Sequence, residues 1–238
     1  MPFLAWLFFL WPQPIFAQNN QTYTDYLYQL NLYQHRYQDY LDHKQTDKLY
    51  HNLASQQDLL ASTKTAVLSR NLALKTYLAY LHDQLNTRHP ADLPASQVIQ
   101  SQLLAWENWL TNQNTLSNPI TADFPTQYMA IQKLISTTRT LIWKNQIQFS
   151  LDQVINLITQ IKQSNFPQPK LLDDLNLKNQ SVITSLNSAW AIVQKYNQTT
   201  TSRFNDFYPL ALAHLNQARN LLKQSLNYLT TILSKYGE

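Results

Sequence analysis

A single glycine in 238 residues, Gly237, restricts what this chain can fold into more than any other feature. Tight β-hairpin turns, β-bulges and phosphate-binding loops rely on glycine, because a residue without a Cβ atom adopts positive φ at no steric cost. A β-rich or α/β protein of this length would need several such positions. The sequence therefore predicts an all-α protein.

Apolar residues spaced three and four apart recur along most of the chain, as in amphipathic helices. Between residues 21 and 87 this pattern has two phases, and the sequence Ser55-Gln56-Gln57-Asp58 between them fits a helix-starting capping box. We expect two helices here, roughly 21–53 and 56–87, with one continuous helix of about 100 Å as the alternative. The two predicted apolar seams are Tyr23, Tyr26, Leu30, Tyr33, Tyr37 and Tyr40, then Leu53, Leu60, Val67, Leu74 and Leu81.

Proline-containing segments at residues 88–94, 112–124 and 165–169 separate further helices, because proline stops a helix. Near the C-terminus, Pro209 either opens or kinks the last helix. Five to six long helices with short links predict an elongated up-and-down bundle or a coiled-coil hairpin array, as one domain over residues 18–238.

The helix expected after residue 124 carries two apolar faces, so its halves should pack against different neighbours. These faces are Ile131, Ile135, Ile142 and Phe149, then Ile147, Leu151, Val154, Ile158 and Ile161. From the phase breaks alone we expect weak protection from hydrogen exchange at residues 44–47 and 142–147.

Residues 1–17 have the features of a secretory signal peptide. Phe3–Trp11 is wholly apolar, two prolines follow it, and Ala17 offers a small residue at the cleavage point. The apolar run is too short to cross a bilayer, which takes about 20 residues. We therefore expect export to the periplasm, the cell surface or the medium, with an uncleaved N-terminal membrane anchor as the alternative. After cleavage no stable membrane span is expected.

The spaced tyrosines of residues 25–40, with the helix after them, resemble uncharacterised exported helical proteins predicted from genomes of uncultivated bacteria. The resemblance covers residues 22–88. It implies a cell-envelope setting, and it implies no activity, cofactor or site residue.

The sequence lacks the residues that most enzyme motifs require. Its one terminal glycine excludes a Walker A loop, a dinucleotide-binding loop and a G-x-S-x-G nucleophile turn. The absence of cysteine excludes disulfides and thiolate chemistry. Glutamate occurs only at Glu107 and Glu238, which excludes the paired glutamates of di-iron bundles. We predict a non-enzymatic protein without a cofactor, and the scattered Lys and Arg residues predict no binding of nucleic acid.

His35, Asp39 and His43 form the candidate metal site of the sequence. Each lies four residues from the next, so the three share a helix face, and imidazole with carboxylate suits Zn²⁺ or Ni²⁺. His35 and Asp39 also fall away from the tyrosine seam, where solvated polar residues are expected in any case. A metal site here is therefore a secondary hypothesis.

Taken together, these features predict an exported helical protein of the cell envelope that acts as a scaffold, adaptor or partner-binding module. Its partner would be another protein or a second copy of itself, bound through the long helical faces. A carrier bundle for a small ligand or a metal is the alternative, and a holdase-like periplasmic chaperone is a third possibility.

Overall fold

The structure, a computed structural model, describes residues 21–87, 93–115, 124–163, 167–198 and 204–236. These residues form six α-helices and contain no β-strand, which confirms the predicted all-α fold. The predicted signal peptide, residues 1–17, lies outside them. The helices are α2 (Gln21–Tyr50), α3 (Leu53–Thr87), α4 (Leu93–Thr115), α5 (Phe124–Gln163), α6 (Pro169–Gln198) and α7 (Phe204–Tyr236).

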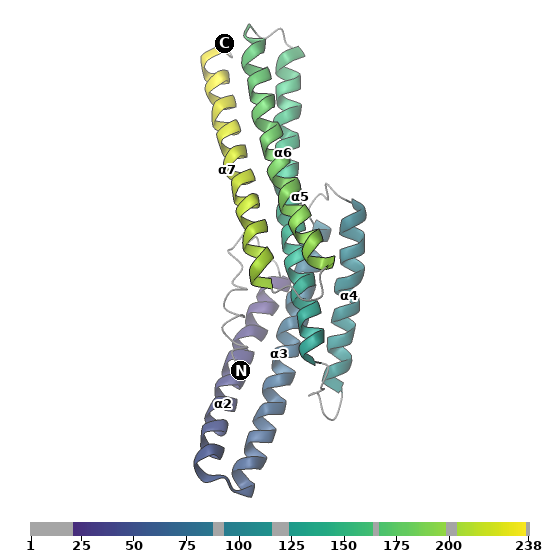
Figure 1. The fold of residues 1–238 in the computed structure, drawn as a ribbon, viewed down its shortest axis with the longest axis vertical. Coiled ribbons are helices and arrows are strands. Elements are labelled where there is room, and N and C mark those ends of the chain that lie inside the picture. Colours follow the sequence, from purple (N-terminus) through teal and green to yellow (C-terminus); the bar gives the residue numbers. More distant parts are fainter. Residues whose placement is uncertain (1–20, 88–92, 116–123, 164–166, 199–203, 237–238) are drawn as a thin grey trace.

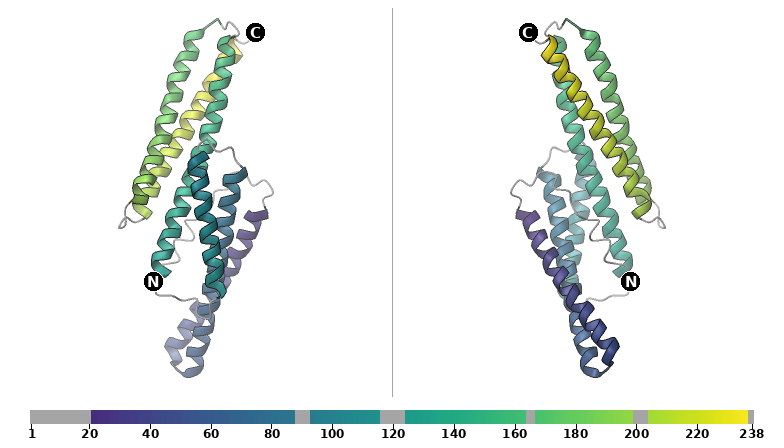
Figure 2. Two further views of the ribbon diagram at one scale, coloured as in Figure 1. Left: turned by 90° about the vertical axis from the view of Figure 1, so that its right-hand side faces the viewer. Right: turned by 90° about the vertical axis from the view of Figure 1, so that its left-hand side faces the viewer.

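Successive helices alternate in direction along one long axis, so the molecule is elongated (Figure 1). The hairpin of α2 and α3 forms one end, with its turn at residues 51–52, and α5, α6 and α7 form the other end. Helix α4 lies along the middle and packs against α3 and α5. In both side views of Figure 2 the hairpin extends beyond the region that α4 and α5 reach.

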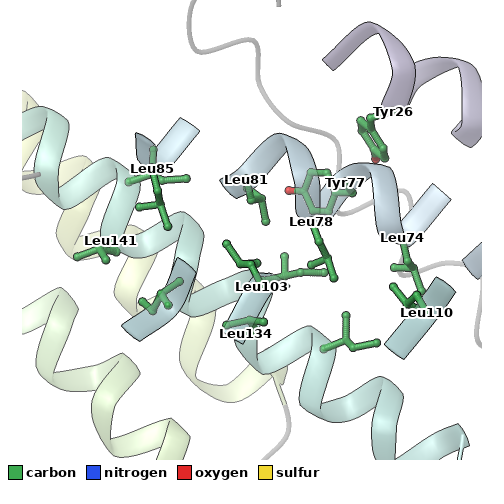
Figure 3. Close-up of a cluster of buried hydrophobic side chains, with 14 of the residues drawn as sticks. Tyr26, Leu74, Tyr77, Leu78, Leu81, Leu85, Leu103, Leu110, Leu134 and Leu141 are labelled. Atoms are coloured by element: carbon green, nitrogen blue, oxygen red, sulfur yellow. The ribbon is translucent and has the colours of Figure 1, made fainter. Parts of the chain in front are cut away.

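Buried apolar side chains form two clusters that share α5. The first joins α2, α3 and α4 to the N-terminal half of α5, around fully buried residues such as Leu78 and Leu103 (Figure 3). The second joins the C-terminal half of α5 to α6 and α7, and Trp143 packs against both clusters. The two predicted faces of α5 are thus confirmed, although Phe149 is exposed rather than part of the first face.

The predicted division of residues 21–87 into two helices is confirmed, but α3 begins at Leu53 rather than near residue 56. The reason is the cap: the side-chain oxygen of Asn52 accepts a hydrogen bond from the Ser55 backbone N–H at 2.9 Å. Asn52 is therefore the N-cap residue, and Ser55 occupies the N3 position instead of starting the helix. His51 completes the turn with a φ of 41°.

The predicted seam of α3 is buried only towards its C-terminal end. Leu74 is 3% exposed, whereas Leu53 and Leu60 are 72% and 67% exposed. The prediction that these two leucines are core residues is wrong, because none of the other described helices covers the far end of the hairpin (Figures 1 and 2). In α2, Tyr26 and Tyr33 are buried as predicted, and the other tyrosines of that seam are partly buried.

Helices α6 and α7 pack along each other, and each buries an apolar face in the second cluster. Pro209 lies inside α7, which begins at Phe204, so it does not open the helix. None of the helices in the described part of the chain carries an apolar stretch long enough to cross a membrane. The buried apolar residues of α6 are Leu172, Leu175, Val182, Leu186, Ala189, Val193 and Tyr196.

Candidate functional site

The three predicted metal ligands follow one another along α2 without forming a ligand group. His35 is exposed, and His43 is partly buried. Asp39 pairs instead with Arg36, with 3.5 Å between the guanidinium nitrogen and the carboxylate oxygen. Across the described helices, no three His, Asp or Glu side chains come together in a way that could hold a metal ion.

Asp39 and His43 do line an open depression of about 210 Å³ between α2 and α3. Arg36 joins them from α2, and Asp58 enters from α3 as the third acidic or imidazole side chain. Both members of the Arg36–Asp39 pair are about half exposed, so water screens their interaction strongly. The depression offers mixed charges to a small polar ligand. Its remaining lining residues, all from α3, are Ala61, Ser62 and Thr65.

A second group of polar side chains, the tyrosine–arginine cluster, brings together residues of α2, α3, α5 and α7. It consists of Tyr23, Tyr26, Tyr77, Tyr80, Arg139 and Tyr208. The rings of Tyr26 and Tyr77 are 4.7 Å apart between centroids, and the Arg139 guanidinium lies 5.3 Å from the centre of the Tyr208 ring.

Burial keeps the phenols of Tyr26 and Tyr77 protonated. Burial, together with the neighbouring phenols, raises the pKa of Tyr26 well above its ordinary value, and burial raises the pKa of Tyr77 to about 12. A phenol that remains neutral through the physiological range supplies no base or nucleophile. The cluster therefore joins helices through ring packing, which agrees with the core position predicted for the tyrosines of α2.

The most distinctive surface is the far end of the hairpin, residues 34–66, which we call the distal hairpin. Six large apolar side chains in the described chain are at least 67% exposed, and four of them are here. Leu53 and Leu60 lie on one face of α3 with Gln57 and Lys64, at spacings of four and three residues. We call these four residues the distal seam. The other two exposed side chains, Leu49 and Tyr50, end α2.

The distal seam continues a face of α3 that is buried elsewhere. Leu74 and Leu81 lie at the same heptad position as Leu53 and Leu60, and they pack in the first cluster against α4 and α5. In Figure 3, Leu74 lies beside Leu110 near the end of α4. The same helical face is thus covered over one half of α3 and open over the other.

Charge on the distal hairpin is balanced. Its four basic residues, Arg36, Lys44, Lys48 and Lys64, match its four acidic residues, Asp39, Asp42, Asp47 and Asp58. The chain as a whole carries a net charge of +4. The distal hairpin therefore presents exposed leucines within a nearly neutral surface.

The sequence contained a signal for the uncovered seam that heptad spacing alone does not reveal. Four residues after Leu74 and Leu81 the chain places Leu78 and Leu85, which widen the apolar stripe, and both are buried. Four residues after Leu53 and Leu60 it places Gln57 and Lys64. An apolar stripe one residue wide on a helix is less completely buried by neighbouring helices than a stripe two residues wide.

No protein-family model matches this chain, and neither the curated proteins nor the solved structures contain a significant match to it.

Proposed function

We propose that this protein is an exported, non-enzymatic helical module of the cell envelope that binds a protein partner through the distal hairpin. One observation carries the proposal: the buried seam of α3 continues into the exposed Leu53 and Leu60. The apolar run, prolines and small residue of positions 1–17 support export.

The exposed leucines give a partner a source of binding energy. Full burial of one leucine side chain contributes roughly 1.5–3 kcal/mol, before the costs of association. An apolar stripe along a helix is the surface on which another helix packs, as α4 and α5 already do on the other half of α3. The elongated hairpin holds this stripe away from the rest of the molecule.

Site-specific photo-crosslinking in the cells that produce the protein tests the proposal. A photoreactive phenylalanine analogue at Leu60 should form a protein adduct. The same analogue at Thr65, which is exposed on a different side of α3, should form little adduct. Comparable yields at both positions, or no adduct at Leu60 in a folded and exported protein, would contradict the proposal.

A carrier of a small ligand or divalent metal is the alternative, and the depression between α2 and α3 favours it. Asp39, His43 and Asp58 line the depression, whereas His35 does not, but the three do not form a metal-ligand group, so a bound metal would have to draw them together. Equilibrium dialysis of the mature protein with Zn²⁺ and with Ni²⁺ tests the metal version. Uptake that Asp39→Asn and His43→Ala both abolish would favour a carrier, and absence of uptake would remove this version.

A further inference from the structure

If the distal hairpin binds a partner, as proposed above, a helix of that partner covers the distal seam. We propose that the occupant is a second copy of this chain, whose distal seam pairs with the first in antiparallel fashion about a two-fold axis. The α3 face that α4 and α5 cover further along would then be covered up to the tip of the hairpin as well.

The spacing of the seam suits a two-fold contact. In an isologous pairing each residue meets the partner residue at the mirrored position along the helix. With the axis level with residues 56–57, Leu53 of one copy faces Leu60 of the other, and this contact occurs twice. The uncharged Gln57 then lies next to the axis, where two equal charges would repel.

Lys64 is also placed favourably by this pairing. The mirrored position lies just beyond the first residue of α3 in the second copy, next to the turn at residues 51–52 where α2 ends. The last carbonyl groups of a helix carry partial negative charge and attract a cation. The pairing therefore sets the one charged residue of the distal seam beside a complementary helix end.

Charge also argues for a second copy over other occupants. With four basic and four acidic residues, the distal hairpin has no net charge that would oppose contact with itself. It equally lacks a basic cluster of the kind that binds anionic lipid. A strongly charged protein partner would find no surface of opposite sign here.

The expected affinity is modest. The paired segments, residues 53–64, are about 18 Å long, so the contact is smaller than the roughly 800 Å² per partner of a typical stable interface. We therefore expect dissociation in the micromolar range, with the monomer predominating at nanomolar concentration.

Cysteine scanning gives a sharp test because the natural chain contains no cysteine. A disulfide requires Cβ atoms about 4 Å apart, so Gln57→Cys should form a dimer on oxidation at about 100 µM protein. The matched control is Asp58→Cys, at nearly the same height on α3 but turned by about 100°. A mixture of Leu53→Cys and Leu60→Cys chains should also crosslink, while each variant alone should not.

A second measurement avoids cysteine altogether. Sedimentation equilibrium over increasing concentration should show a monomer–dimer equilibrium for the mature protein, and Leu60→Glu should weaken it at least tenfold. Circular dichroism should be unchanged by this substitution because Leu60 is already exposed. A purely monomeric wild type at 100 µM, or equal crosslinking of the Gln57 and Asp58 variants, would overturn the second-copy assignment.

The cellular photo-crosslink at Leu60 separates the two proposals. An adduct of two copies of this chain supports both. An adduct with a different protein leaves the proposed function standing and overturns self-pairing, and a lipid adduct overturns both.

Discussion

Asn52 and Ser55 exchange two hydrogen bonds at the start of α3. The Ser55 backbone N–H donates to the Asn52 side-chain oxygen at 2.9 Å, and the Asn52 backbone N–H donates to the Ser55 hydroxyl oxygen at 3.1 Å. The Ser55 hydroxyl also donates to an Asp47 carboxylate oxygen at 2.8 Å. This bond links the last turn of α2 to the first turn of α3, so the pair fixes the two-residue turn that shapes the distal hairpin.

Replacing Ser55 with alanine should lower the free energy of unfolding by about 1–2 kcal/mol, because the bonds of its hydroxyl to the Asn52 backbone N–H and to Asp47 are lost, whereas the Asn52 side chain still caps the helix. Urea denaturation followed by circular dichroism measures this change. Ser69→Ala is the control, since the Ser69 hydroxyl bonds only to the Thr65 carbonyl of its own helix. Equal effects of the two substitutions would show that the bonds of the Ser55 hydroxyl to Asn52 and Asp47 contribute nothing particular.

Two leucines at the same heptad position of α3 should respond differently to truncation. Leu74→Ala should cost about 2–5 kcal/mol because it leaves a cavity in the first cluster. Leu60→Ala should cost less than about 0.5 kcal/mol, since that side chain is exposed. Urea unfolding at nanomolar protein, where the monomer predominates, makes the comparison. A large loss at Leu60 under these conditions would mean that the monomer itself covers the distal seam.

The free energy of unfolding should fall at high pH, because the buried tyrosines ionise more easily in the unfolded state than in the folded state. Burial raises the pKa of Tyr33 to about 12, whereas an unfolded tyrosine ionises near 10. Below pH 10 both states are protonated and stability is constant. Between pH 10 and 12 only the unfolded state releases the proton, so the native state loses about 2–3 kcal/mol from this residue. Urea unfolding from pH 8 to 12 should show a shallower decline for Tyr33→Phe, and an unchanged decline would exclude Tyr33 as a source.

Asn179 is 1% exposed on the buried side of α6, and its side-chain amide has no hydrogen-bond partner among the described residues. An apolar residue of similar size avoids the desolvation cost of that amide. Asn179→Leu should therefore raise the free energy of unfolding by about 1–3 kcal/mol. Asn187→Leu, at an exposed position of the same helix, should change it by less than about 0.5 kcal/mol. Thermal and urea unfolding would both reveal destabilisation at Asn179 if the amide has a structural role.

Hydrogen exchange should distinguish the two breaks in apolar phase. Residues 44–47 lie near the end of α2, next to exposed side chains, and their amides should exchange rapidly. Residues 142–147 lie inside α5, where Ile142, Asn145 and Ile147 are buried, and should be protected. The breaks in apolar phase predict weak protection from exchange at both segments, and the structure changes that expectation for residues 142–147. Rapid exchange at 142–147 would show that α5 opens between the clusters.

The helices could be predicted because their causes are local. Scarcity of glycine, prolines between segments and repeated three-four spacing each act within a few residues, and the buried face of α6 follows from them. The turn between α2 and α3 could not be predicted in detail. It places His51 at positive φ, at a cost of about 1 kcal/mol, where glycine is the usual residue.

The candidate site was harder to predict because it depends on which helices meet. The spacing of His35, Asp39 and His43 describes one helix, yet α3 decides which of these residues share a depression and adds Asp58. Likewise, the exposure of Leu53 and Leu60 depends on where α4 ends and α5 begins. Those helix ends lie far from the leucines in the sequence, so the pattern around Leu53 and Leu60 does not contain them.

Helix α5 runs unbroken through both clusters for 40 residues, a strut of about 60 Å. Each residue inserted into it would lengthen the strut by about 1.5 Å and rotate one half against the other by about 100°. Most single insertions would therefore turn one apolar face into water. Insertions and deletions that α5 tolerates should therefore be close to whole numbers of turns, such as seven residues. The distance between the two ends of the molecule would then change in steps of about that length.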